Sequence, residues 1–274
     1  MKTLAKTLFV SGLLLGGMSM ALARVATAEP MAMKFNVYVS GLKAMRVTFH
    51  GALERKGYAG VADMKPKGLA GLFVKKKLHM EVKGRFNDRH AYPVRFTIRT
   101  KKKGREKAAS VQWDGKGRIV GWERRPPLGV GQRQEVRAAI AGGAIDPLSM
   151  LFAIGVRTEA NPCAGKMRLF DGLTVFDIRM AGVGQDRVRS GTYRGPALKC
   201  RLVYVPVAGM SESKKRKRLN NPPVFTVWLA RVRSAALGPI WVPVQAAGRL
   251  KGRPFTASLA AATLNDAPLV PASR

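Results

Sequence analysis

The sequence is poor in the residues from which catalytic and metal sites are built. Its 274 residues include 16 Asp and Glu, 3 His and 2 Cys, against 49 Lys and Arg. The histidines, His50, His79 and His90, share no ligand spacing with the cysteines, so the sequence predicts neither a metal site nor a cofactor. The scarcity of acids also leaves few groups for general acid or base chemistry.

The first residues have the pattern of an export signal. Lys2 and Lys6 precede an apolar stretch over residues 7–22. This stretch is too short and too rich in glycine for a membrane span, which needs about 20 predominantly apolar residues. An Ala-x-Ala cleavage site ends at Ala28. We therefore expect a signal peptide over residues 1–28 and a soluble protein in the periplasm of a Gram-negative bacterium, with an uncleaved anchor as the alternative.

The charge of the chain is strongly one-sided. The formal net charge is +33, and the signal peptide holds three cations and no acid, so the mature chain carries +30. A charge of this size implies anionic surroundings. For an exported protein these are lipopolysaccharide phosphates, phospholipid head groups or wall polymers, and no nucleic acid partner is expected. Adaptation of a whole proteome to a high isoelectric point is the rival hypothesis.

Basic residues gather in clusters that are candidates for binding an anionic envelope surface. For any single cluster, the structural alternative is a solvated turn or strand end. The candidate residues are Lys75, Lys76, Lys77, Lys101, Lys102, Lys103, Lys214, Lys215, Arg216, Lys217 and Arg218, and Arg105, Arg124 and Arg125 add to them.

The two cysteines, Cys163 and Cys200, both lie in the mature chain beside turn residues. An even, isolated pair in an oxidising compartment predicts a disulfide bond between them. A redox pair is not indicated, because the sequence has no Cys-x-x-Cys motif at these positions.

Past Pro30, short runs of aromatic and β-branched residues alternate with turn residues, which is typical of consecutive antiparallel strands. About a dozen such strands form one mainly β domain over residues 29–268. Apolar residues at helical spacing predict one or two inserted helices, over residues 132–141 and 147–155. Residues 211–221 are expected to form a basic linker loop. Prolines in the last strands, Pro239, Pro243 and Pro254, predict edge positions or bends.

Several residues have the chemistry of catalytic groups but not the context. Asp146 precedes Pro147 as a helix cap, and Asp171 begins a turn with Gly172, so the acids Asp146, Asp171 and Asp177 do not form an evident catalytic pair. Ser149 lacks the Gly-x-Ser-x-Gly elbow. The segment Gly129-Val130-Gly131 follows prolines and no buried strand, so it does not fit a nucleotide loop. We expect no enzyme, and a periplasmic hydrolase is a remote alternative.

The helix expected over residues 147–155 is apolar on nearly all sides, which is typical of a buried helix. It either fills the core of a curved sheet or lines a ligand groove there. The candidate groove or core residues are Leu148, Leu151, Phe152, Phe176 and Trp228.

Seven motifs in order carry a resemblance to a known family. They are Val39-Ser40-Gly41-Leu42-Lys43, Asp146-Pro147-Leu148-Ser149, Pro162-Cys163 with Leu169-Phe170-Asp171-Gly172, Tyr193-Arg194-Gly195-Pro196-Ala197 with Cys200, Tyr204-Val205-Pro206-Val207-Ala208-Gly209, Pro222-Pro223 with Val227-Trp228-Leu229, and Val242-Pro243-Val244. In these motifs the chain resembles an exported proteobacterial family of unknown function, DUF3108. The resemblance covers nearly all of the mature chain.

The resemblance implies a periplasmic protein with a paired cysteine bridge and an open, spiral antiparallel β-barrel, similar to periplasmic lipoprotein carrier and receptor proteins. The run Lys214-Lys215-Arg216-Lys217-Arg218 departs from the family pattern, where a mixed linker is expected. We therefore expect a non-catalytic factor for cell-envelope integrity that binds a lipid or lipidated partner in an apolar groove. The alternative is a highly basic, envelope- or wall-associated interaction protein with a filled barrel.

Overall fold

The computed structural model describes residues 28–68, 76–158, 161–250 and 252–271. The expected signal peptide, except for its last residue, and Lys75 lie outside the described residues. None of the described helices is long and apolar enough to cross a membrane.

The chain forms one antiparallel sheet, so the expected mainly β fold is confirmed. Its fourteen strands are β1 (Glu29–Val39), β2 (Leu42–Leu53), β3 (Gly57–Pro66), β4 (Lys76–Asn87), β5 (His90–Lys102), β6 (Arg105–Trp113), β7 (Ile119–Arg125), β8 (Gly165–Phe170), β9 (Val175–Ser190), β10 (Tyr193–Ala208), β11 (Val224–Ser234), β12 (Gly238–Leu250), β13 (Arg253–Leu264) and β14 (Ala267–Pro268). Three helices, α1 (Val130–Ile140), α2 (Pro147–Gly155) and α3 (Glu212–Asn220), complete the described part of the chain.

The sheet consists of two meanders that are joined through the first and the last long strand. Strands β1 to β7 pair in chain order, strands β8 to β13 do the same, and β1 pairs with β13. The path is open, with β7 and β8 at its two edges. Side chains bridge these edges: the indole of Trp122 on β7 donates to the carbonyl of Gly172 at 2.9 Å, beside the turn that joins β8 to β9. The result is an open, barrel-like sheet.

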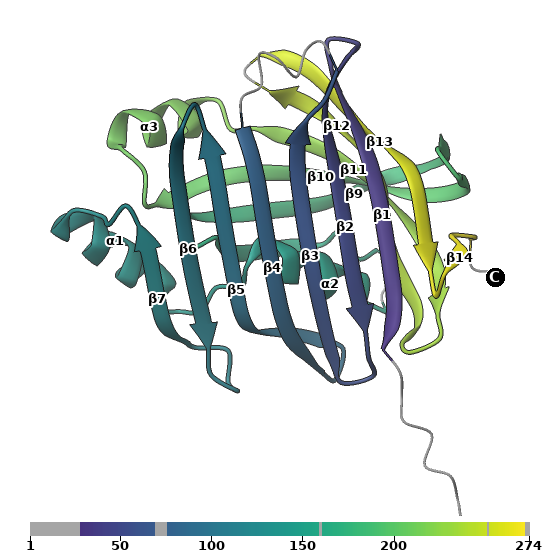
Figure 1. Ribbon diagram of the computed structural model, residues 1–274, viewed down its shortest axis with the longest axis horizontal. Helices are drawn as coiled ribbons and strands as arrows, with labels where there is room; N and C mark the ends of the chain where they lie inside the picture. The colour runs from purple at the N-terminus through teal and green to yellow at the C-terminus, as the bar shows by residue number, and fades with distance from the viewer. Residues whose placement is uncertain (1–27, 69–75, 159–160, 251, 272–274) are drawn as a thin grey trace, which may run out of the picture.

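The two meanders lie in different layers, with a helix between them. In Figure 1, β1 to β7 run upright at the front, and β9 and β10 run across behind them. Helix α2 contacts β4 and β5 of the first meander and β8 and β12 of the second. Helix α1 packs against β9 and β10. The expected helices therefore form, and α2 spans the predicted residues.

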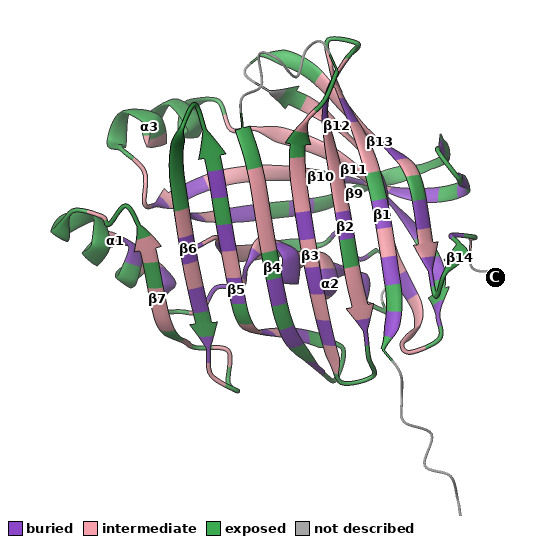
Figure 2. Ribbon diagram, viewed as in Figure 1, coloured by how far each residue is buried: buried purple, intermediate pink, exposed green. Residues whose placement is uncertain are grey.

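Alternation of side chains explains why the strands form. On β5, Phe96, Ile98 and Thr100 are buried, whereas Arg95, just before them, and Arg99, between Ile98 and Thr100, are exposed. Such a period of two buries one face of a strand against the core and leaves the other in water. Figure 2 shows buried and exposed residues alternating along the front strands.

One expectation about local structure is corrected, and another is confirmed. Residues 211–221 do not form a loop, because they contain α3. Lys and Arg are good helix formers, and Glu212 lies in the first turn, where an acid is favourable. The prediction that the prolines lie at edge positions or bends is confirmed at Pro243, although β12 and β13 are interior strands of the sheet. Pro243 lies at a bulge opposite Leu229, and β12 pairs with β13 only from Gln245 onward, so the missing N–H of Pro243 is not needed there.

Candidate functional site

Helix α2 owes its position to its cap and to its composition. The side chain of Asp146 accepts hydrogen bonds from the backbone N–H groups of Leu148 and Ser149, and Pro147 follows in the first turn. This confirms the predicted cap and satisfies two of the free N–H groups at the start of the helix. The helix carries no charged side chain, so it is stable only with apolar neighbours on several sides.

A buried polar contact fixes α2 to the first meander. The hydroxyl groups of Tyr58 and Ser149 lie 2.8 Å apart, and both residues are buried. Burial raises the pKa of Asp146 to about 6 and raises that of Tyr58 above its usual range. Asp146 and Ser149 have no exposed surface, so neither is open to a substrate in this conformation. Their contacts hold the helix in place.

An apolar cavity of about 280 Å³ lies beside α2, between the two meanders. The helix contributes Met150, Leu151 and Ile154 to its lining. The strands contribute residues from β1, β2, β9 to β13, among them Leu202 and Trp241. Gln245 and the Trp241 indole supply the only polar side-chain groups of the lining. Met150, Leu151, Leu202 and Trp241 are partly exposed, so the cavity is accessible from the solvent.

A second, much smaller lobe adjoins this cavity. Its volume is about 30 Å³, and it shares Leu151, Trp241 and Pro243 with the larger lobe. Phe152 fills this side, with its ring centroid 5.9 Å from that of Phe49. The interior is therefore packed on one side of Leu151 and hollow on the other.

The disulfide bond predicted from the sequence is present and forms part of the cavity wall. Cys163 and Cys200 are bonded across 37 residues, with their Cα atoms 5.7 Å apart. Both residues are buried and line the larger lobe. The bond fixes the segment after α2 to β10, and it thereby holds one wall of the cavity to the next.

The structure places the predicted groove residues in different surroundings. Leu151 lines the larger lobe, and Phe152 lines the smaller one. Leu148 is a core residue. Phe176 stacks on Tyr204 with ring centroids 4.7 Å apart, outside the lining. Trp228 also lies outside it and donates from its indole to Asp186 at 2.7 Å.

Sequence reasoning missed several residues of the lining, above all Trp241. This residue alternates with Pro243 along β12, which is a recognisable strand pattern. A bulge inserts one extra residue into β12 between Pro243 and Gln245, so Ala246 returns to the cavity although an unbroken alternation would turn it away. Arg231 lies over the Trp241 ring at 5.8 Å from its centroid, which places a cation beside the lining.

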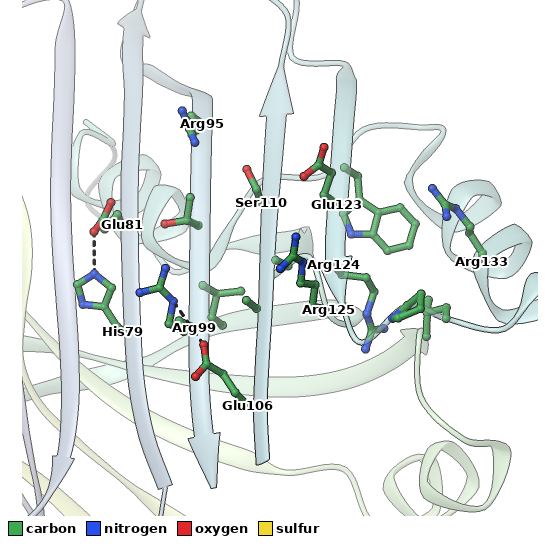
Figure 3. Close-up of a pocket in the computed structure, with 17 residues that line it drawn as sticks. His79, Glu81, Arg95, Arg99, Glu106, Ser110, Glu123, Arg124, Arg125 and Arg133 are labelled. Atoms are coloured by element: carbon green, nitrogen blue, oxygen red, sulfur yellow. Dashed lines mark hydrogen bonds and ion pairs between the residues drawn. The ribbon is translucent and has the colours of Figure 1, made fainter. Parts of the chain in front are cut away.

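A larger and polar hollow of about 980 Å³ runs along β4 to β7 and the start of α1 (Figure 3). Glu81 bonds Nε2 of His79 at 2.7 Å, and Glu106 pairs with Arg99 at 3.6 Å. The hydrogen bond to Glu81 is the largest cause that raises the pKa of His79. Five arginines line this hollow together with three glutamates: they are Arg95, Arg99, Arg124, Arg125 and Arg133. Opposite charges thus partly balance here, and this hollow is not the predicted apolar groove.

The remaining candidate acids support local structure. Asp171 accepts from the N–H groups of Leu173 and Thr174, as expected of a turn residue. Asp177 is buried and binds the guanidinium of Arg168. Among the described residues, no group of three His, Cys, Asp or Glu side chains is placed to hold a metal ion.

The predicted basic clusters converge at one end of the first meander. Lys76 and Lys77 begin β4, and they lie opposite Lys102 and Lys101 at the end of β5. The third cluster forms most of α3, which contacts β10.

Comparison with known proteins identifies the family of this chain. A search of the curated proteins finds no match. Among solved structures, a β-barrel-like protein of the domain of unknown function DUF1849 from Brucella abortus is similar over 86% of this chain and 98% of its own, with 10% identity and a TM-score of 0.47. LprF from Mycobacterium bovis is similar over 83% of each chain, with 11% identity and a TM-score of 0.25. The sequence model of the family described as "Protein of unknown function (DUF3108)" matches residues 34–248, and the chain belongs to this family.

Proposed function

We propose that the protein is a non-catalytic periplasmic factor for envelope integrity whose cavity binds one apolar chain, from a lipid or a lipidated partner. The cavity of about 280 Å³ beside α2 is the observation that carries the proposal. Its lining offers almost no hydrogen-bonding groups, and apolar cavities of this kind favour apolar ligands over water. Ligand pockets usually measure about 300–1,000 Å³, so this volume suits a single chain better than a bulky molecule.

The rim of the cavity supports a ligand with an acidic head group. Arg231 is exposed and lies against the face of Trp241, which lines the cavity. A carboxylate or phosphate at the end of an apolar chain would meet this guanidinium without entering the apolar lining. Fatty acids and phospholipids have this arrangement of charge.

The proposed location in the periplasm rests on the sequence and is compatible with the covalent structure. The amino-terminal pattern is that of a cleaved signal peptide. Disulfide bonds persist in oxidising compartments such as the periplasm, and Cys163 and Cys200 form one. Intact-mass analysis of the protein from the periplasmic fraction is expected to give a chain that begins at Glu29. A chain retaining residues 1–28 would contradict the location.

The second candidate function is an interaction protein whose interior is filled by its own side chains. The small lobe favours it, because Phe49 and Phe152 leave only about 30 Å³ there. The two candidates differ in what the larger lobe contains, so the test addresses that lobe.

The test uses two neighbouring alanines of β12 that differ in their surroundings. Ala246 lines the larger lobe, whereas Ala247 does not. Ala246→Leu should displace bound lipid, which native mass spectrometry detects, and should weaken binding of a fluorescent fatty acid about tenfold or more. Ala247→Leu is the matched control and should bind the probe as the unaltered protein does. Equal binding by all three proteins, or no lipid and no probe binding by the unaltered protein, would favour the filled interior.

Arg231→Gln provides an independent measurement at the rim. It should weaken binding of the fatty acid by several fold and leave binding of an uncharged fatty alcohol nearly unchanged, because only the acid has a charge for the guanidinium to contact. A similar loss for both probes would exclude a role for Arg231 in reading the head group.

A further inference from the structure

Three strand ends meet in a surface that carries almost only positive charge. We name it the cationic end, and it consists of Lys76, Lys77, Lys101, Lys102, Lys103, Arg105 and Lys107, all of them exposed. Figure 1 shows the starts of β4 and β6 and the end of β5 at the same end of the first meander. One acid, Glu106, lies among these residues, and it pairs with Arg99 instead.

The sheet register places like charges directly opposite one another. Lys76 lies opposite Lys102, Lys77 opposite Lys101, and Lys102 also opposite Arg105 on its other side. Like charges in directly opposed positions of a ladder destabilise a sheet. Among the ion pairs between described residues, none involves a residue of the cationic end. The fold therefore retains an electrostatic cost that an anionic partner would remove.

Helix α3 extends this surface from a distant part of the sequence. Lys215 bonds Glu135 of α1 at 2.7 Å, and the guanidinium of Arg218 lies 5.1 Å from the centre of the Tyr204 ring on β10. These contacts hold the helix in place and leave Lys214, Arg216 and Lys217 exposed. Partial shielding from water lowers the pKa of Lys76; the nearby carboxylate of Asp171 raises it, and the charges of Lys102, Arg218 and Lys107 lower it further. The influence of Arg218 shows that α3 and the strand ends are near enough to interact.

We propose that the cationic end and the exposed side of α3 form a docking surface for an anionic lipid bilayer. The charges lie on strand ends and on a helix, and they line neither the apolar cavity with its small lobe nor the polar hollow. This arrangement fits an extended charged surface better than a small anion, which needs converging groups. Lysine predominates, and each lysine near an anionic bilayer strengthens binding by about fivefold. The docking surface does not depend on what the cavity holds.

The test is sedimentation of the protein, as isolated from cells, with vesicles of phosphatidylcholine containing about one third phosphatidylglycerol. Binding is expected with these vesicles and not with pure phosphatidylcholine, and it should decrease as salt shortens the range of the charges. Replacing Lys76, Lys102 and Lys217 together by Gln should weaken binding roughly 100-fold.

A matched control removes the same number of positive charges from the opposite end of the first meander. Lys56, Lys83 and Lys116 are exposed and lie toward the other ends of these strands. Replacing these three by Gln should weaken vesicle binding less than about fivefold, because only long-range attraction is reduced. An equal loss in both triple variants would show that net charge alone acts, and it would overturn the docking surface.

Two further measurements distinguish the docking surface from a structural role of its lysines and from lipid binding in the cavity. Lys102→Gln should raise the melting temperature slightly, since it relieves repulsion with Lys76 and Arg105; a lower melting temperature would mean that the lysine is structural. Ala246→Leu, the cavity variant, should bind vesicles as the unaltered protein does, so failure of the cavity proposal leaves this one standing. Binding to a soluble polyanion such as polyphosphate, with no binding to the anionic vesicles at low salt, would refute the bilayer as the partner.

Discussion

The carboxylate of Glu29, in the first residue of β1, accepts a hydrogen bond from the hydroxyl of Ser234, which lies 205 positions along the chain. The same carboxylate accepts from the N–H groups of Ala235 at 2.9 Å and Ala236 at 3.2 Å. Glu29 is only 5% exposed. The turn between β11 and β12 is thus fixed to the very start of the sheet. The proposed signal cleavage after Ala28 leaves this contact intact.

Replacing Glu29 by Ala should lower the free energy of unfolding by about 2–3 kcal/mol, because it leaves a buried hydroxyl and two N–H groups without their acceptor. Glu29→Gln keeps one acceptor oxygen and should lose less. Urea unfolding of each variant measures the difference. Glu123→Ala, at an exposed position on β7, is the control and should stay within about 0.5 kcal/mol of the unaltered protein. If Glu29→Ala unfolds at the same urea concentration as that control, the hydrogen bonds of Glu29 contribute little to stability.

Gly172 lies where the two edges of the open sheet approach each other, and its lack of a side chain allows this close approach. It has a φ of +74°, and a Cβ atom at this position would lie 2.5 Å from Cβ of Ala109 on β6. Gly104, in the turn between β5 and β6, has a similar φ of +77° but no atom within 4 Å of such a Cβ. The two glycines therefore share the backbone requirement and differ only in packing.

Gly104→Ala should cost about 1 kcal/mol of stability from its left-handed backbone conformation alone. Gly172→Ala should cost this amount and a further 1–3 kcal/mol or so from overpacking against β6. Thermal unfolding of the two variants side by side gives the difference directly. Equal losses would mean that β6 and the turn after β8 move apart freely, and that the edge of the sheet is looser than described.

The disulfide bond should contribute about 3–4 kcal/mol to stability, as expected for a loop of 37 residues in the chain-entropy model. Replacing Cys163 and Cys200 together by Ala should remove this amount in urea unfolding. A reducing agent should destabilise the unaltered protein similarly and leave the double variant unaffected, which makes the variant its own control. A reducing agent that destabilises both proteins equally would act elsewhere, and the predicted contribution would be wrong.

Local patterns in the sequence were sufficient to predict most of the strands and helix α2. Alternation marks β5, and Asp146 with Pro147 marks the start of α2, because both signals depend on neighbouring residues alone. The middle of the long β9–β10 hairpin was missed, since residues 181–187 of β9 are all exposed and show no alternation. Helix α3 was also missed, although its Lys and Arg are good helix formers and Glu212 lies in its first turn. Only its position depends on distant residues, through the contacts with Glu135 and Tyr204.

The cavity could be predicted only in part, because its lining comes from elements far apart in the chain. The sequence identified α2 as the apolar helix, and Leu151 does line the cavity. It selected Trp228 and not Trp241, but Val227 and Leu229 on either side of Trp228 line the cavity and Trp228 does not, as alternation along β11 requires. The basic clusters were visible, but their meeting depends on the register that opposes Lys76 with Lys102.

Asp146 is an acid that the fold holds in an unfavourable environment for its charge. Its Oδ1 accepts two backbone hydrogen bonds, whereas Oδ2 is buried without a partner among the described residues. Burial raises the pKa of this carboxyl from the usual 3.8 to about 6. At a pH between these two pKa values, the Asp146 carboxyl has lost its proton in the unfolded chain and still holds it in the folded chain. Stability therefore falls as the pH rises from about 4 to about 6, and it does not recover above that range.

Asp146→Asn should remove this pH dependence, because Asn keeps the capping oxygen and has no charge to bury. Relative to the unaltered protein, the variant should gain up to about 3 kcal/mol between pH 4 and pH 7.5, since each pKa unit corresponds to about 1.4 kcal/mol. Asp146→Ala loses the cap and should be about 1 kcal/mol less stable than Asn at both pH values. Urea unfolding of the three proteins at constant ionic strength measures these differences. Stabilities of the Asp and Asn proteins that change in parallel with pH would show that Asp146 titrates normally and that α2 carries its charge without cost.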